Sequence, residues 1–242
     1  MKFSDADVFI LAAGFGKRLR PLTDNIPKPL VKVGNRELIS YHLSQLEVLG
    51  FKRVIVNSHY LANKLQEYLI SFSKSSSLEI VTVFEEEILD TGGGIKNIEK
   101  LLNSEYLFTI NSDAFFGSGL PLETLFNKHE GSGRSVDVTF LLKEVPSPDQ
   151  YGIIGANSNG EVVKFLTAEK PNMGFKKYIY TGVQLLKTSL IAKMEAGVFS
   201  ITRDFYLSNF CNLNIFAHEY KDYWNDCGTI DSIKDVEKFL SS

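Results

Sequence analysis

The stretch from Val8 to Leu30, VFILAAGFGKRLRPLTDNIPKPL, constrains the fold more than any other part of this 242-residue chain. It opens with the uninterrupted apolar run Val8–Ala13, and a glycine follows at once. An apolar run that is too short for a helix and is closed by glycine is typical of a strand buried on both faces. The sequence therefore predicts a fully buried strand here, with a loop at its carboxyl end.

That loop combines two glycines, Gly14 and Gly16, with three cations, Lys17, Arg18 and Arg20. Glycine lets the backbone approach a ligand closely and point N–H groups at it, and the cations suit a polyphosphate. The glycine pair alone is a weak signal, because a tight turn between a strand and a helix needs the same residues. Neither the third glycine of a dinucleotide fingerprint nor the Gly-Lys-Ser/Thr of a Walker loop follows.

Composition narrows the class of protein. The net charge of −3 gives no reason to expect a nucleic-acid polymer or an anionic membrane as a partner. Cys211 and Cys227 form neither a disulfide framework nor a zinc motif, and Cys227 is expected to be a small buried group rather than a nucleophile. The start MKFSDADVF does not resemble a signal peptide, and no apolar run is long enough to span a bilayer. These features predict a cytoplasmic enzyme or binding protein.

Up to residue 127 the pattern alternates between strands and helices, which is typical of a parallel, doubly wound sheet. The expected strands are residues 8–13, 54–56, 78–84 and 106–110, and the expected helices are residues 37–49, 61–72 and 90–102. Strand-like runs then follow one another, at 136–142, 152–156, 162–166, 178–186 and 213–218. Helices are expected at 199–210, with Ser200 or Thr202 as the cap, and at 230–240, with Thr229 as the cap.

We therefore expect an α/β fold, in which a Rossmann-like, doubly wound mixed sheet is flanked by helices and extended by a smaller β-rich sub-region. No linker separates the two parts, so residues 1–242 are predicted to form one domain. Its expected halves are residues 1–130, which would bind a nucleotide, and residues 131–242.

Polar residues follow the expected strands at their carboxyl ends, where open α/β sheets bind ligands. Asn57 and His59 follow the second strand, although a lone histidine there is more often a satisfied loop residue. Asp113 follows the fourth, where a carboxylate is well placed to hold a divalent cation against phosphate oxygens. The three acids at 85–87, after the third strand, are expected to be a solvated face.

The longer string LAAGFGKRLRPLTDNIPKPL, residues 11–30, resembles the signature of the sugar nucleotidyltransferases. These enzymes join a sugar 1-phosphate to a nucleoside triphosphate and release pyrophosphate. Further motifs share the resemblance: DTGGGI at 90–95 is similar to ETGGGI, NSD at 111–113 to N-G-D, and WNDCGT at 224–229 to W-x-D-V-G-T. The first of these points in particular to the short bacterial N-acetylmuramate-1-phosphate uridylyltransferase type, which makes a cell-wall precursor.

The resemblance implies a set of roles. Arg18 would contact the leaving phosphates and Lys28 would bridge the α-phosphate and the sugar phosphate, as the catalytic residues. Asp113 and Asp226 would hold Mg²⁺. The implied nucleotide-binding residues are Leu11, Ala12, Ala13, Gly14, Gly16, Lys17, Arg18, Asn57, Thr91, Gly92 and Asn111. The TGGGI stretch favours uridine as the base.

The resemblance makes residues 131–242 the sugar-binding half, and it implies four sugar-side residues besides Lys28. Glu169 and Lys170, in an E-K-P motif, would take sugar hydroxyls and the sugar phosphate. Gly152 belongs to a Tyr-Gly turn, and Thr181 begins a Thr-Gly turn near the hexose.

Three functions stay open at this point. The first is the transfer described, in which an anionic phosphate attacks the α-phosphorus and positioning supplies most of the catalysis. The second is a cytidylyltransferase that acts on a phospho-alcohol such as phosphocholine. The third is a non-catalytic nucleotide sensor, which predicts damaged metal ligands or cations. The expected partners are a nucleoside triphosphate and a sugar 1-phosphate, and the residues leave open whether the chain forms a homo-oligomer.

Overall fold

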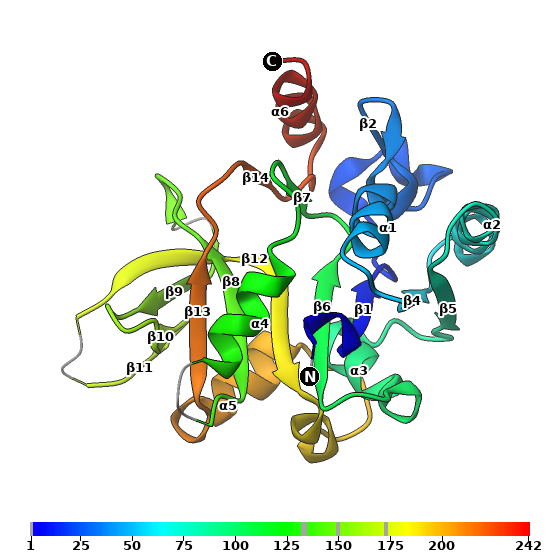
Figure 1. The fold of residues 1–242 in the computed structure, drawn as a ribbon. Helices are drawn as coiled ribbons and strands as arrows, with labels where there is room; N and C mark the ends of the chain where they lie inside the picture. The colour runs from blue at the N-terminus through cyan, green and yellow to red at the C-terminus, as the bar shows by residue number, and fades with distance from the viewer. Residues whose placement is uncertain (1, 132–134, 149–150, 172–173) are drawn as a thin grey trace. The chain divides into compact units, whose positions relative to one another are not determined.

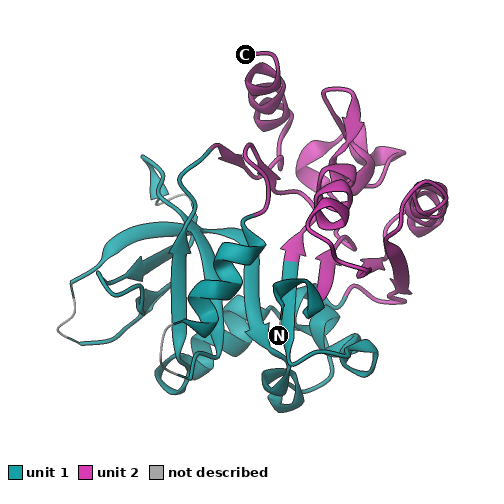
Figure 2. Ribbon diagram, in the orientation of Figure 1, with its two compact units in different colours: residues 1–6, 89–109, 121–222 teal, residues 7–88, 110–120, 223–242 magenta. Residues whose placement is uncertain are grey.

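The computed structural model describes residues 2–131, 135–148, 151–171 and 174–242 (Figure 1). The chain forms two compact units: unit 1 comprises residues 1–6, 89–109 and 121–222, and unit 2 comprises residues 7–88, 110–120 and 223–242 (Figure 2). Each unit combines separate stretches of sequence. The division of a single domain into halves near residue 130 stays a prediction. No helix in the described part of the chain is long and apolar enough to cross a bilayer.

Unit 2 contains a parallel sheet of buried strands. β1 (Asp7–Leu11) pairs with β4 (Arg53–Ser58), which pairs with β5 (Glu79–Phe84). In the register, Phe9 lies opposite Ile55, which lies opposite Val81. The connections are α1 (Leu38–Val48) and α2 (Ala62–Ser73). The alternation of strands and helices predicted from the apolar pattern is confirmed.

Smaller elements complete unit 2. Short 3-10 turns span Lys17–Leu19, Leu22–Asp24 and Lys28–Leu30. Two antiparallel pairs follow, β2 (Lys32–Val33) with β3 (Arg36–Glu37), and β7 (Phe115–Phe116) with β14 (Trp224–Asn225). The last helix, α6 (Ile230–Leu240), begins at the predicted cap, because the Thr229 hydroxyl accepts a hydrogen bond from the Ser232 N–H.

Unit 1 is the β-rich part of the chain. Its sheet has the order β11 (Ala168–Glu169), β10 (Val162–Phe165), β9 (Ile153–Ala156), β12 (Lys176–Lys187) and β6 (Tyr106–Asn111), whose last two residues belong to unit 2. β8 (Val138–Lys143) pairs antiparallel with β12 and parallel with β13 (Ile215–Glu219). The antiparallel and mixed strands predicted here are confirmed.

The helices of unit 1 are short. Among the described residues they include α3 (Asp90–Asn97), which a 3-10 turn at Glu99–Leu101 follows, α4 (Leu122–Glu130) and α5 (Leu207–Asn209). α4 packs on β8 (Figure 1). The helix predicted at 199–210 is instead a π-helical turn, Ile201–Tyr206, followed by α5. Its cap is Ser200, whose hydroxyl accepts from the Arg203 N–H.

One core cluster of unit 2 joins the last helix to the loop after β1. Its buried members are Leu19, Val31, Val33, Leu38, Phe115, Cys227, Ile233 and Val236. Residues of the 12–31 segment and of α6 thus share one apolar cluster. The loop therefore rests on packing as well as on hydrogen bonds.

We expect Val236→Ala to destabilise the protein by about 2 kcal/mol, because it removes two methyl groups from this cluster and leaves a cavity. The matched control is Val48→Ala: Val48 is 87% exposed and Val236 is 0% exposed. Urea unfolding measures both variants. Equal midpoints for the two variants would contradict the assignment of Val236 to the core.

Candidate functional site

The loop after β1 is folded back on Lys28. Gly16 has a φ of +63°, a conformation that other residues adopt at a cost. A Cβ atom at this position would lie 3.0 Å from Lys28 Cβ and 3.0 Å from Thr23 Cγ2. The Thr23 hydroxyl donates a hydrogen bond of 2.9 Å to the Gly16 carbonyl. Gly16 is thus required both by the turn and by the close approach of Lys28.

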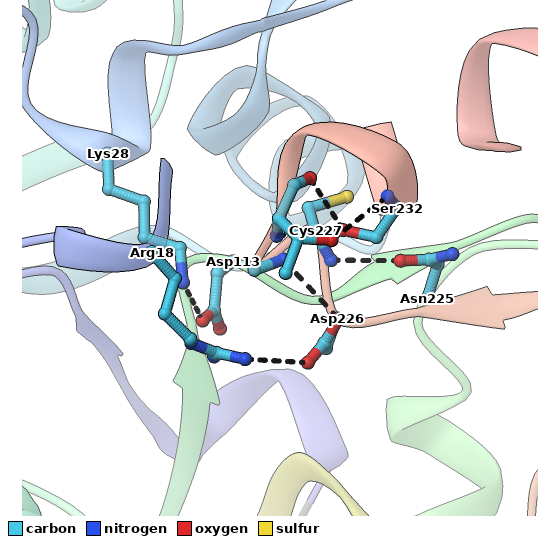
Figure 3. A network of polar contacts seen from close by, with 9 residues as sticks. Arg18, Lys28, Asp113, Asn225, Asp226, Cys227 and Ser232 are labelled. Carbon is cyan, nitrogen blue, oxygen red and sulfur yellow. Dashed lines mark hydrogen bonds and ion pairs between the residues drawn. The ribbon is translucent and has the colours of Figure 1, made fainter. Parts of the chain in front are cut away.

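Lys28 pairs with Asp113. The Lys28 ammonium donates a hydrogen bond to Asp113 Oδ2, and the two side chains are 13% and 25% exposed (Figure 3). Asp113 lies in the turn after β6, which is tied to β1 because the Ser112 N–H donates to the Leu11 carbonyl at 3.1 Å. The turn that carries the Asp113 carboxylate is thus fixed at the end of β1.

Arg18 forms a longer ion pair with Asp226 at the surface. The distance from Arg18 Nη1 to Asp226 Oδ2 is 3.8 Å, and the side chains are 65% and 27% exposed (Figure 3). Asp226 Oδ1 accepts from the Gly228 N–H at 3.3 Å. A Cβ atom at Gly228 would come within 2.6 Å of the Arg18 guanidinium. A larger residue at 228 would therefore displace the Arg18 guanidinium from the position seen here.

The Cys227 thiol lies close enough to both carboxylates for each of them to affect its pKa. Its thiol is buried, as predicted. Burial, with the charges of Asp113 and Asp226, raises the pKa of the thiol to about 12, while Lys28 lowers it. The group is therefore a neutral thiol at physiological pH. Asp113, Asp226 and Lys28 all lie within electrostatic range of its sulfur.

His42, in α1, is buried and lies within electrostatic range of Asp113. Complete burial lowers the pKa of its imidazole to about 4, against the opposing charge of Asp113 and a hydrogen bond with the Ala114 backbone. The ring is thus neutral at pH 7, and the positive charges of the cluster are Arg18 and Lys28. The sequence does not single out His42, because a histidine in an apolar helix carries no signal of its own.

The donor set of Asp113 and Asp226 fits a hard divalent cation. Carboxylate oxygens are the ligands that Mg²⁺ prefers, and Mg²⁺ is often held by one or two carboxylates with water and phosphate oxygens completing the shell. The described residues form no group of three or more His, Cys, Asp or Glu that could hold a metal. A cation here would therefore take its remaining ligands from water and the substrate phosphates.

Asn57 fixes the backbone of the loop from the side of β4. Its Oδ1 accepts a hydrogen bond of 2.6 Å from the Ala12 N–H, and its Nδ2 donates to Glu85 Oε1 at 2.7 Å. Asn57 and Glu85 are each only 2% exposed. The prediction that the acids at 85–87 form a solvated face is therefore wrong for Glu85, because its amide continues the pairing of β5 with β4 and its side chain points inward.

The remaining residues predicted in the loop lie together in unit 2. Ala12 and Ala13 are buried, Leu11 is partly buried and ends β1, and Gly14 is exposed. The Lys17 ammonium lies over the Phe15 ring, 5.2 Å from its centre. Asn111 ends β6, and its carbonyl accepts from the Ala114 N–H.

Thr91 and Gly92, the other predicted nucleotide residues, lie in unit 1. There they hold the segment that precedes the π-helical turn. The Gly92 N–H donates to the Phe199 carbonyl at 2.9 Å, and the Thr91 hydroxyl accepts from the Ile201 N–H at 3.0 Å. The Gly92 amide is thus engaged within the chain, and a nucleotide contact for these two residues stays a prediction.

The residues predicted for the sugar also lie in unit 1. Glu169 pairs with Lys164, directly opposite on β10, at 2.7 Å, and Lys170 pairs with Glu161 at 2.9 Å. Adjacent residues of an extended segment point to opposite faces, so the structure does not bring these two side chains together. Gly152 is exposed just before β9. Sugar-binding roles for these residues stay predictions.

The Thr181-Gly182 turn expected from the sequence is wrong. Both residues lie inside β12, where Gly182 has a φ of +91° and the register with β8 shifts between Tyr180 and Gln184. A glycine with positive φ in a strand makes a bulge rather than a chain reversal. Thr181 is 1% exposed and its hydroxyl donates to the Leu141 carbonyl at 2.7 Å.

The chain belongs to the Nucleotidyl transferase family, whose pattern matches residues 7–242. Among its relatives is mannose-1-phosphate guanylyltransferase 1 of Arabidopsis thaliana, 30% identical over 238 residues that cover 96% of this chain and 64% of the relative. The catalytic subunit beta of the Drosophila melanogaster mannose-1-phosphate guanylyltransferase is 28% identical over 90% of this chain and 58% of its own length. The chain thus spans about 60% of the length of these curated relatives.

Solved structures agree with this assignment. The crystal structure of HddC from Yersinia pseudotuberculosis complexed with GMP-PN has a TM-score of 0.78 and 26% identity, and covers 97% of this chain and 99% of its own. A putative glucose-1-phosphate thymidylyltransferase from Bacillus anthracis has a TM-score of 0.78 at 18% identity, with 96% of this chain and 94% of its own covered, and shows the fold alone. The predicted family and fold class are confirmed, whereas the N-acetylmuramate-1-phosphate uridylyltransferase type stays a prediction.

Only one of the two cysteines should react with an aromatic disulfide reagent in the native protein at pH 8. Cys211 is exposed, whereas Cys227 is buried with a pKa of about 12 and holds almost no thiolate at that pH. The release of the coloured thiol measures the stoichiometry, which should double in denaturant. Cys211→Ser is the control and should abolish the fast reaction. Two rapid equivalents in the native state would show that Cys227 is accessible.

Proposed function

We propose that this protein is a nucleotidyltransferase that joins a sugar 1-phosphate to a nucleoside triphosphate and releases pyrophosphate. The observation that carries the proposal is the pairing of Lys28 with Asp113 and of Arg18 with Asp226 beside a glycine-bearing loop. Such a set of cations and carboxylates suits the handling of two polyanions. Membership of the Nucleotidyl transferase family and the names of the relatives support it.

The chemistry needs no strong base. The attacking oxygen of a sugar phosphate is already anionic, so the task is to bring two polyanions together and to stabilise the charge that develops. Lys28 would lie between the α-phosphate and the sugar phosphate, Arg18 would contact the leaving phosphates, and the loop amides would cradle them. Asp113 and Asp226 would hold Mg²⁺, which supplies charge neutralisation at the phosphates when bound.

We propose guanosine as the base. The sequence prediction of uridine depends on the TGGGI stretch alone. The curated relatives carry the name guanylyltransferase, and the HddC structure is a complex with GMP-PN. A non-catalytic sensor is disfavoured, because the two cations and both predicted metal ligands are present and paired.

The deciding experiment is pyrophosphate release with Mg²⁺ across four nucleoside triphosphates, each combined with a panel of sugar 1-phosphates and with phosphocholine. We expect release with GTP and a hexose 1-phosphate, and little with UTP. Release with UTP would instead favour the uridylyltransferase type, and release only with CTP and phosphocholine would favour the phospho-alcohol alternative. No release with any pair would contradict the proposal.

Asp113→Asn and Asp226→Asn should each lower kcat by at least about a hundredfold, because each removes a negative charge from the group that would hold the cation. The matched control is Asp222→Asn, an exposed aspartate close to Asp226 in sequence, which should turn over normally. Initial rates of pyrophosphate release measure the effect, and thermal melting checks the fold. Wild-type rates in either variant would remove that residue from the metal site.

A further inference from the structure

We propose that Glu85 is a positioning residue for the phosphate-binding loop: it acts through the Asn57 side chain on the backbone of Ala12. The inference rests on the proposed function, because it concerns how the same loop is held for a triphosphate. Glu85 does not itself need to touch the substrate. It sets the direction of the hydrogen bonds on which the loop depends.

The geometry is a chain of buried hydrogen bonds from β5 through β4 to β1. The Glu85 N–H donates to the Ser58 carbonyl at 2.9 Å, which continues the β4–β5 ladder one residue beyond β5. The Asn57 Nδ2 donates to Glu85 Oε1 at 2.7 Å, and Asn57 Oδ1 accepts from the Ala12 N–H at 2.6 Å. Two buried side chains therefore link the end of β5 to the first residue beyond β1.

The Glu85 carboxylate sets the donor and acceptor order of this series of hydrogen bonds. An asparagine amide can present either its oxygen or its NH₂ group to a neighbour, and the two orientations are nearly the same shape. The Glu85 oxygen accepts the hydrogen bond from Asn57, so the NH₂ group of Asn57 faces Glu85. The Asn57 oxygen is then left facing Ala12. The reverse orientation would set a donor against the Ala12 N–H and leave buried polar groups unsatisfied, which is costly.

Ala12 is the first residue of the loop after β1. The paired register of β1 with β4 includes Ile10 opposite Val56, and Ala12 lies just after the strand, two residues before Gly14. The Asn57 side chain thus supplies the partner that a neighbouring strand would otherwise give. On the other side, the Leu11 carbonyl accepts from the Ser112 N–H in the turn that carries Asp113. Because the Ala12 N–H and the Leu11 carbonyl are both held, the direction of the loop amides is set before a ligand binds.

The neighbours of Glu85 give a matched control. Glu86 and Glu87 follow it directly and are exposed, so they share its chemistry and sequence context but not its burial. An effect of total negative charge near the loop would be the same for Glu85 and Glu86. A positioning role predicts an effect for Glu85 alone.

The test reverses the hydrogen-bond pattern and then restores it. Asn57→Asp alone sets two acceptors against each other, and should raise the Kd for GTP at least about tenfold, the loss of roughly one buried hydrogen bond. Combining it with Glu85→Gln lets the amide introduced at position 85 donate to the carboxylate introduced at position 57, which can still accept from Ala12. The double variant should return to within about threefold of the wild-type Kd, with the KM for the sugar phosphate little changed throughout.

Isothermal titration calorimetry measures the Kd, and thermal melting shows that the nearly isosteric variants are folded. Glu86→Gln should bind GTP as the wild type does. Restoration of affinity in the double variant supports the inference. A double variant that binds more weakly than Asn57→Asp, or an Asn57→Asp variant with unchanged Kd, overturns it while leaving the proposed function intact. Wild-type protein that binds no triphosphate and releases no pyrophosphate overturns the proposed function first.

Discussion

The backbone at the end of β1 is the constraint on which the candidate site in unit 2 depends. Leu11 ends β1 and Ala12 lies just beyond it, and their polar groups are bound by the Ser112 amide and by the Asn57 side chain. Gly14, Gly16 and the cations beyond them start from this fixed point. A loop that must meet a polyanion with several amides at once gains from such preorganisation, because less order has to be created on binding.

The electrostatics of the site follow from placing cations against carboxylates. Lys28 and Asp113 are mostly buried, so each compensates the charge of the other where water screens weakly. The neutral imidazole of His42 and the protonated thiol of Cys227 add no charge to this arrangement. The net charge of the site is therefore set by the two ion pairs, whose residues would contact the phosphates and a cation.

Much of this could be predicted from the sequence. Apolar runs and their spacing give the strands and helices of unit 2, and the caps at Ser200 and Thr229 follow from the residue types. The placement of Asp113 is expected because ligands bind at the carboxyl ends of the strands, whereas the roles of Lys28 and Asp226 are implied by the family resemblance. These features depend on local pattern and on topology, both of which the sequence expresses directly.

Other features could not be predicted, for physical reasons. Glu85 looks like one of three solvated acids, and only the register of β5 shows that it alone turns inward. Glu169 and Lys170 look like a joint motif, but neighbouring residues in an extended segment face opposite ways. Thr181 looks like the start of a turn, and the bulge that Gly182 makes is visible only in the pairing of β12 with β8. All three cases depend on how the strands are paired, and strand register cannot be read from a single sequence.

The unequal exposure of the two ion pairs has a consequence for the choice of buffer. Arg18 is 65% exposed in its pair with Asp226, whereas Lys28 is 13% exposed in its pair with Asp113. The Debye length falls from about 8 Å at physiological ionic strength to about 3 Å at 1 M salt, so dissolved ions screen the outer pair and hardly reach the inner one. Raising the ionic strength should therefore weaken the ion pair of Arg18 with Asp226 and leave that of Lys28 with Asp113 largely intact, without any change to the sequence.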